Sequence, residues 1–174
     1  MLFADAFKYK QWANAELLAL GERQLNQMPE SDAEFFVRIL NHTTVVDSLF
    51  ISRLSGEAEC YSGDNTRETP TFDELRARIA QNDAWLVTFA ERATAEELQR
   101  VIVFRFTDGD LGQLSVEEVL LHLLTHGSNH RGMAARTLAI NGLERPKDTF
   151  TRYLHEAQPG RRELAREALG EPLN

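Results

Sequence analysis

The stretch from residue 115 to residue 142, SVEEVLLHLLTHGSNHRGMAARTLAING, constrains the fold of this chain more than any other part of the sequence. Its apolar residues recur at i, i+3 and i+4 spacing, which is the pattern of an amphipathic helix. Ser115 and Glu118 match the S-x-x-E capping box that precedes many helices. The Asn-Gly pair at the other end tolerates the left-handed conformation in which helices stop. The sequence therefore predicts one long helix over residues 116–140.

Three of the five histidines of the chain, His122, His126 and His130, lie in this predicted helix at i, i+4 and i+8. Helix neighbours four residues apart have Cβ atoms about 5–6 Å apart, so two of them are able to share one ion. His122 and His130 are separated by about 12 Å of helix rise, whereas metal–nitrogen bonds are only about 2.1 Å long. The helix therefore offers one pair of ligands. An isolated H-x-x-x-H pair is as compatible with two surface histidines as with a metal site.

Three further segments have the apolar periodicity of long helices, and they span about residues 3–27, 32–54 and 72–92. Capping boxes that start at Ser31 and Thr71 are expected to open the second and third of them. With the helix over 116–140, the chain has four long helices, which is typical of a helix bundle.

The sequence pattern changes from helical to strand-like between the third and fourth long helices. Residues 101–106, VIVFRF, are β-branched and aromatic, and the turn TDGD follows them before residues 111–114 return. This pattern predicts a small β-hairpin. The expected fold is therefore all-α, a four-helix bundle with a small β-hairpin before the last long helix, and residues 1–174 form a single domain.

The charge of the chain argues against nucleic acid as a partner. Its formal net charge is −8, so a binding face would have to attract phosphates against the overall field. Cys60 is the only cysteine, which excludes an intramolecular disulfide and fits a reducing compartment. The first ten residues do not resemble a signal peptide, and no apolar run approaches the roughly 20 residues that span a bilayer. We therefore expect a cytoplasmic protein with no membrane partner.

His42 lies in the middle of the second predicted helix among apolar neighbours. A lone histidine in such a position is more often a core residue than a ligand. Helix bundles, however, build metal sites from side chains on facing helices, so His42 is placed to join a pair from the last long helix. Three histidines would leave coordination positions open, which favours catalysis over a purely structural ion. Asp47 is a candidate partner or base for such a site, but an acid in solvent is the more common role.

Several short motifs resemble those of the DinB/YfiT-like superfamily. The run HGSNHRG resembles its H-x-x-x-H-R-G-Q motif, YKQWAN resembles its Y-N-x-W-A-N motif, and a histidine in the second helix and a short tail motif also match. The residues that carry the resemblance are 9–14, Asn41-His42, 126–132, Asp148 and Tyr153-Leu154. Together they extend over nearly the whole chain.

The resemblance implies that His42, His126 and His130 bind one divalent metal ion. Imidazole ligands suit zinc, nickel or iron. The resemblance leaves His122 outside the ligand set. This agrees with the distance along the helix, which is too long for His122 and His130 to bind the same ion. His155 is expected to lie at the surface.

Two residues depart from the family pattern. Met133 stands in place of the glutamine that follows R-G, and Lys10 stands in place of the asparagine in the first-helix motif. Methionine cannot hydrogen-bond as an amide does, so an orienting role of that glutamine is absent here. We expect Arg131 to be structural and to pair with an acid or a carbonyl, with anion binding as the alternative.

Relatives with known activities imply the function. They include isomerases and S-transferases that use low-molecular-weight thiols, so the expected activity is metal-dependent transfer of such a thiol to a small electrophile. The alternatives are a metal-dependent hydrolase and a non-catalytic metal-binding domain. Cys60 lies in a polar loop with no cation beside it, so a reactive thiol is expected to come from a second substrate. Related domains also imply a homodimer.

Overall fold

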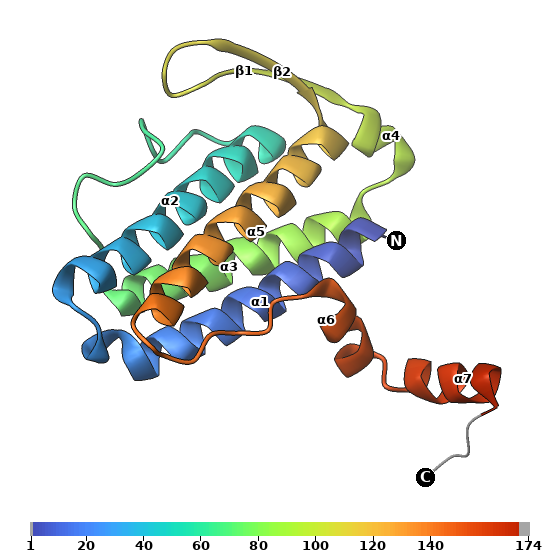
Figure 1. Cartoon of the computed structure of the whole chain (residues 1–174). Coiled ribbons are helices and arrows are strands. Elements are labelled where there is room, and N and C mark those ends of the chain that lie inside the picture. Colours follow the sequence, from blue (N-terminus) through green and yellow to red (C-terminus); the bar gives the residue numbers. More distant parts are fainter. Residues whose placement is uncertain (1, 171–174) are drawn as a thin grey trace.

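The computed structural model describes residues 2–170 as a mostly helical chain with a tail and a small hairpin (Figure 1). The four long helices are α1 (Leu2–Gln24), α2 (Glu30–Ser55), α3 (Phe72–Arg92) and α5 (Val116–Ile140). The shorter elements are the 3-10 turn η1 (Leu25–Gln27), α4 (Ala95–Gln99), β1 (Val101–Arg105), β2 (Leu111–Ser115), α6 (Phe150–Ala157) and α7 (Gly160–Leu169).

The long helices lie side by side, and each contacts two others. Helix α1 packs against α3 and α5, and α2 packs against α5 and α3. The antiparallel strands β1 and β2 pair Val101 with Ser115 and Arg105 with Leu111, and they lie at one end of the helices (Figure 1). The predicted hairpin before the last long helix is confirmed. Within residues 2–170, no helix is both long enough and apolar enough to cross a lipid bilayer.

Two of the predicted helix starts are confirmed in detail. At the start of α3, the backbone N–H of Glu74 donates to the Thr71 hydroxyl, and the Glu74 carboxylate accepts from the Thr71 N–H. Ser115 and Glu118 make the same two bonds at the start of α5. Each pair satisfies two backbone N–H groups that the first turn would otherwise leave without partners.

The predicted capping box at Ser31 is wrong. Helix α2 begins earlier, at Glu30, and Pro29 precedes it with no side-chain hydrogen bond. The Pro29 carbonyl accepts the backbone N–H of Asp32 at 3.0 Å, so Ser31 already lies inside the first turn. Proline has a fixed φ that suits a helix start, and this fixed backbone overrides the serine signal.

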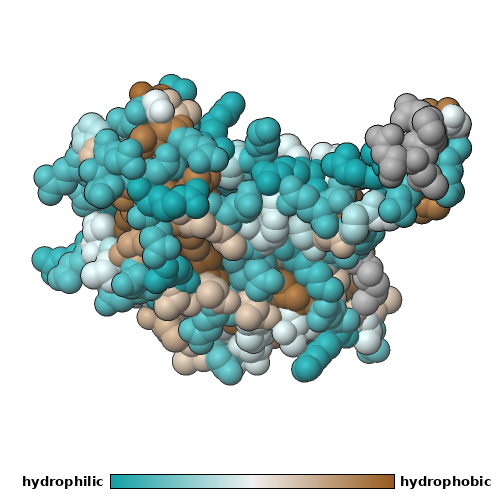
Figure 2. Space-filling view, turned by 90° about the horizontal axis from the view of Figure 1, so that it is seen from below, coloured by the Kyte–Doolittle hydropathy of each residue, from teal (hydrophilic) through white to brown (hydrophobic). Residues whose placement is uncertain are grey.

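The tail after α5 folds back on α1. Trp12 and Tyr153 have ring centroids 5.8 Å apart, and the Arg152 guanidinium lies 5.2 Å from the Trp12 ring. Trp12 is half-buried and anchors α6 to α1. Helix α7 follows α6 and projects from the body of the molecule, whose face in this view is largely hydrophilic (Figure 2). Residues 171–174 lie outside the described residues.

The core consists of two apolar clusters with a polar layer between them. One cluster lies toward the hairpin and includes Phe7, Phe50, Leu86, Val116 and Leu120. The other lies toward the opposite end of the helices and includes Leu17, Phe36, Leu40, Leu75 and Leu138. Each long helix therefore passes from one apolar cluster to the other, and the positions between them carry polar side chains.

Lys10 is the centre of this polar layer. Its Nζ donates to Asp47 Oδ2 at 2.7 Å and to Asp83 Oδ1 at 2.8 Å, which joins α1 to α2 and α3. Asn14 Nδ2 donates to the other oxygen of Asp83 at 2.8 Å. The side chains of Lys10, Asp47 and Asp83 are 1%, 5% and 3% exposed. The expectation that Asp47 lies in solvent is therefore wrong, because the cation that compensates it comes from another helix.

Burial and ion pairing shift the pKa values of this cluster in opposite directions. Burial raises the pKa of Asp47 to about 6, although the Lys10 ammonium opposes that rise. Burial lowers the pKa of Lys10, but the two carboxylates outweigh it, so the net shift of that pKa is upward. Lys10 consequently stays charged at neutral pH and continues to hold both aspartates.

We predict that Lys10→Met destabilises the protein by about 3–5 kcal/mol, because it leaves two buried carboxylates without their cation. The measurement is urea unfolding followed by circular dichroism. Lys8→Met is the matched control on the same helix, since Lys8 pairs with Glu91 at the surface, and its stability should not change measurably. A Lys10→Met variant as stable as the control would show that the ion cluster does not hold the helices together.

Candidate metal centre

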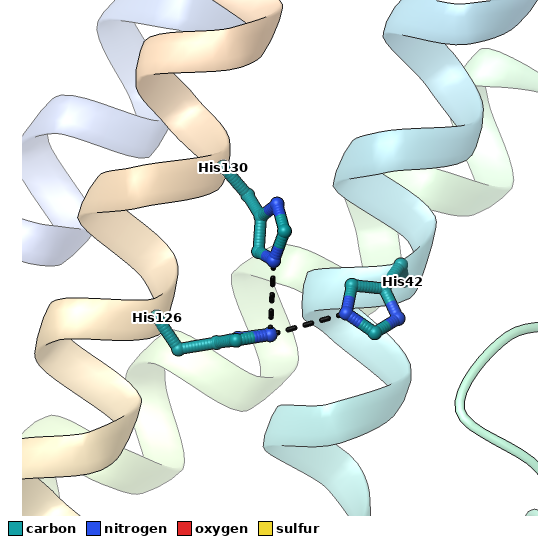
Figure 3. Close-up of side chains that lie close together, drawn as sticks. All are labelled: His42, His126 and His130. Atoms are coloured by element: carbon teal, nitrogen blue, oxygen red, sulfur yellow. Dashed lines mark hydrogen bonds between the residues drawn. The ribbon is translucent and has the colours of Figure 1, made fainter.

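Three of the five histidines come together where α2 and α5 pack against each other (Figure 3). His42 projects from α2. His126 and His130 project from successive turns of α5 on the side that faces α2. All three side chains are half-buried, and one ring nitrogen of each lies within 4.8 Å of the other two. Within residues 2–170 the structure thus brings together the three histidines that the sequence analysis selected.

The contacts between these rings are not those of an ordinary hydrogen-bond network. His126 Nε2 lies 3.1 Å from His42 Nε2 and 3.0 Å from His130 Nε2. One ring nitrogen carries either a single proton or a single lone pair, so it satisfies only one of these two contacts as a hydrogen bond. A cation between the nitrogens would satisfy all three lone pairs at once.

The spacing of the nitrogens also suits one ion. Two nitrogens bound at about 2.1 Å to a tetrahedral ion lie roughly 3.4 Å apart. The two Nε2–Nε2 distances of 3.1 and 3.0 Å are close to that value. The donor set therefore fits a divalent ion that accepts imidazole nitrogen.

His42 is oriented by the loop between α2 and α3. Its Nδ1–H donates to the backbone carbonyl of Asp64 at 2.7 Å, which directs the Nε2 lone pair toward the two histidines of α5. Ligand histidines commonly donate their second ring N–H in this way. Asn41 Nδ2 and Arg38 Nη1 hold the loop in place by donating to Thr66. The sequence indicated a polar loop here, but it contained no signal for this orienting contact.

The two histidines of α5 are held mainly by packing. Their Nδ1 atoms are buried and have no hydrogen-bond partner in the described part of the chain. Burial, together with the neighbouring imidazoles, lowers the pKa of His126 to about 3. Burial also lowers the pKa of His130. Both rings are therefore neutral at pH 7, which is the form that binds a metal.

The remaining histidines and the cysteine lie outside the cluster. The His122 ring stacks on His126 with centroids 5.3 Å apart, one turn away from the converging nitrogens. His155 lies on α6, where its Nδ1 is 2.7 Å from the Thr151 carbonyl. Cys60 is exposed in the loop after α2.

A second ion pair ties the tail to the back of the site. Arg131 Nε donates to Asp148 Oδ2 at 2.8 Å, so the expectation that Arg131 pairs with an acid is confirmed. The Tyr9 hydroxyl donates to the other oxygen of the same carboxylate. Burial and the hydrogen bond to Asp148 raise the pKa of Tyr9 to about 12, so this phenol remains a donor at neutral pH.

The polar layer of the core runs directly behind the ligands. A Cβ placed on Gly127, the residue after His126, would lie 3.2 Å from Lys10 Cε, so the glycine leaves room for the lysine stem. Asp47, considered as a base, is bound to Lys10 on this buried side and does not face the open side of the histidines. The signal that was missed is periodicity, because Lys10 continues the core stripe of Phe7 and Leu17 on α1.

A comparison with protein families identifies the chain. A model of the DinB family matches residues 3–163. The chain belongs to the DinB family. The matched region of this DinB family chain contains all three clustered histidines and the Lys10 core. Searches of curated proteins and of solved structures returned no match.

We predict that the purified protein binds one zinc ion per chain and that His42→Ala and His126→Ala abolish this binding. Removing one of three ligands leaves too few donors for a stable site. Metal content is measured by inductively coupled plasma mass spectrometry after dialysis. His155→Ala is the control and should retain the full content, because His155 lies on α6. Full metal content in the His126→Ala protein would contradict the assignment.

We also expect zinc to stabilise the folded chain. At free zinc about 100 times the dissociation constant, the free energy of unfolding rises by about 2.7 kcal/mol, since only the folded state assembles the three nitrogens. Differential scanning calorimetry with and without a chelator measures the change. The same addition to His42→Ala should leave the melting temperature unchanged, and an equal rise there would place the zinc elsewhere.

The metal-free protein should lose stability on acidification because of His126. Its pKa of about 3 in the folded chain lies below the value of about 6.5 in an unfolded chain. The unfolded chain therefore binds this proton first, and stability falls as the pH drops from about 6.5 toward 3. Urea unfolding in a chelator should show a smaller loss between pH 6.5 and 5 for His126→Gln than for the wild type. Parallel losses in the two proteins would refute this effect.

Proposed function

We propose that this DinB family protein is a four-helix bundle metalloenzyme that transfers a low-molecular-weight thiol to a small electrophile. His42, His126 and His130 would hold one divalent ion. The observation that carries the proposal is the convergence of three Nε2 atoms, one from each histidine, at a half-exposed position. Three ligands leave at least one coordination position for a substrate, as in catalytic sites.

The chain itself contributes orientation and access. The Asp64 carbonyl holds the His42 ring with its Nε2 toward the other ligands. The His42 side chain is 21% exposed, so the site is reachable from solvent. When bound, a divalent ion in such a site supplies Lewis acidity, which lowers the pKa of a coordinated thiol or water. Imidazole ligands suit zinc, nickel and iron alike.

The source of the thiol follows from the position of the only cysteine. Cys60 is exposed in the loop after α2 and is not part of the histidine cluster. A thiol at the open side of the histidines would therefore come from a second substrate. In the transfer, the thiol gives up its proton, its sulfur forms a bond to the electrophilic carbon, and the leaving group departs with its electron pair.

The test uses a panel of small thiols with a chromogenic electrophile. We expect the zinc-loaded protein to give a thiol-dependent rate and the His42→Ala protein to show only the background rate. Turnover of esters or amides without any thiol, dependent on the metal, would favour hydrolysis instead. Loss of folding on metal removal, with no turnover of either kind, would favour a non-catalytic metal-binding domain.

We further propose that the protein forms a homodimer. Several large apolar side chains on α5 are exposed, including Leu121 at 56% and Ile140 at 59%. Contact with a second copy would cover such side chains. Light scattering should then give about twice the chain mass of 19.8 kDa, and a monomer mass throughout the micromolar range would rule the dimer out.

A further inference from the structure

The ring of His122 lies beside the candidate metal centre but is not one of its three histidines. It stacks on His126 with an angle of 27° between the ring planes and centroids 5.3 Å apart. Phe50, a buried residue of α2, contacts it from a second side at 5.3 Å. The His122 ring is thus held by two other rings, and the residue is nevertheless exposed to solvent.

Within residues 2–170, the ring nitrogens of His122 make no hydrogen bond to the protein, and only its backbone carbonyl accepts one, from Thr125. The side chain therefore has no structural hydrogen bond that would explain its place. What it offers at the surface is an aromatic ring next to His126, one of the three clustered histidines.

The aromatic surface continues toward the hairpin. Phe104 lies 5.5 Å from Phe50, and Phe106 lies 4.8 Å from Phe104, measured between ring centroids. A Cβ on Gly112 would come within 2.7 Å of both hairpin phenylalanine rings, so only glycine lets them lie across β2. The guanidinium of Arg53 lies over the rings of Phe50 and Phe104 and holds this aromatic strip against α2.

The opposite side of the metal centre is polar. There the His42 ring contacts the Asp64 carbonyl, and Asn65 and Thr66 follow along the loop. A ligand whose reactive end lies at the three histidines would therefore have the exposed His122 ring on the hairpin side and polar backbone on the loop side. This difference in polarity would orient a bound ligand, with its apolar part toward the hairpin and its polar part toward the loop.

We propose that His122 is a substrate-binding residue and that the electrophile carries an aromatic or conjugated ring, which stacks on it. The proposal rests on the proposed function only in placing the reactive end of the ligand at the three histidines. Stacked rings attract each other beyond the area that they bury. A flat ring should therefore bind about tenfold more tightly than a flexible chain with the same number of carbons.

The test measures binding directly and does not depend on turnover. Benzohydroxamate and heptanohydroxamate both chelate a metal through the same two oxygens, and they differ in carrying a ring or a chain. Isothermal titration calorimetry on the zinc-loaded protein gives both dissociation constants. His122→Ala should weaken benzohydroxamate about tenfold and change heptanohydroxamate less than twofold. His122→Phe should restore the binding of benzohydroxamate, because it keeps a ring without its nitrogens.

His155→Ala is the matched control. His155 lies on α6, outside the histidine cluster, where its Nδ1 is 2.7 Å from the Thr151 carbonyl, so neither dissociation constant should change. Metal content and melting temperature of each variant verify that the fold and the ion are intact. An equal loss for both hydroxamates in His122→Ala, no loss for either, or no binding to the wild type would each overturn the proposal.

A second measurement separates this inference from the proposed function. Styrene oxide and 1,2-epoxyoctane are matched electrophiles whose ring opening forms a carbon–sulfur bond, breaks a carbon–oxygen bond and takes a proton from water. His122→Ala should raise KM about tenfold for styrene oxide alone and leave kcat unchanged. If the hydroxamate preference holds while no thiol reacts, S-transfer fails and the aromatic site stands. If thiol transfer proceeds but His122→Ala affects styrene oxide and 1,2-epoxyoctane equally, the proposed aromatic site fails.

Discussion

The buried ion cluster of Lys10, Asp47 and Asp83 is the interaction on which the arrangement of the helices depends. It joins three helices at one level of the core, with bonds of 2.7 and 2.8 Å and almost no exposure. A buried charge without its partners is strongly destabilising, so a shift of the helices that separates these three side chains is costly. The apolar clusters on either side supply most of the buried apolar surface.

This register determines where the histidines meet. Gly127 lets the Lys10 stem lie against α5 immediately behind His126. The same packing places His42 of α2 opposite His126 and His130 (Figure 3). The core between the helices thus contains charged side chains that neutralise one another. The edge between α2 and α5, in contrast, brings together three imidazoles whose converging nitrogens share no protein partner within residues 2–170. That contrast distinguishes a structural ion cluster from a site that suits an added cation.

Much of the fold was predicted correctly from local sequence patterns, and the predictions that were wrong have physical causes. The helices over 72–92 and 116–140 have their predicted bounds, because each begins with a reciprocal capping box. The start of α2 was misplaced, since a proline at the preceding position opened the helix before Ser31. Asp47 was assigned to solvent because the lysine that neutralises it lies 37 positions away.

The sequence by itself determined that His122, His126 and His130 share a face of one helix and that His122 and His130 are too far apart to bind the same ion. Those conclusions depend on helix geometry, which backbone bonds between residues four apart impose. Only the tertiary structure decided that His42 completes the cluster from 84 positions away. It alone showed that the Asp64 carbonyl orients this ring and that Lys10 is buried between two carboxylates. These contacts depend on how the helices pack, because side-chain burial and charge pairing between distant segments are properties of the assembled core and not of any local pattern.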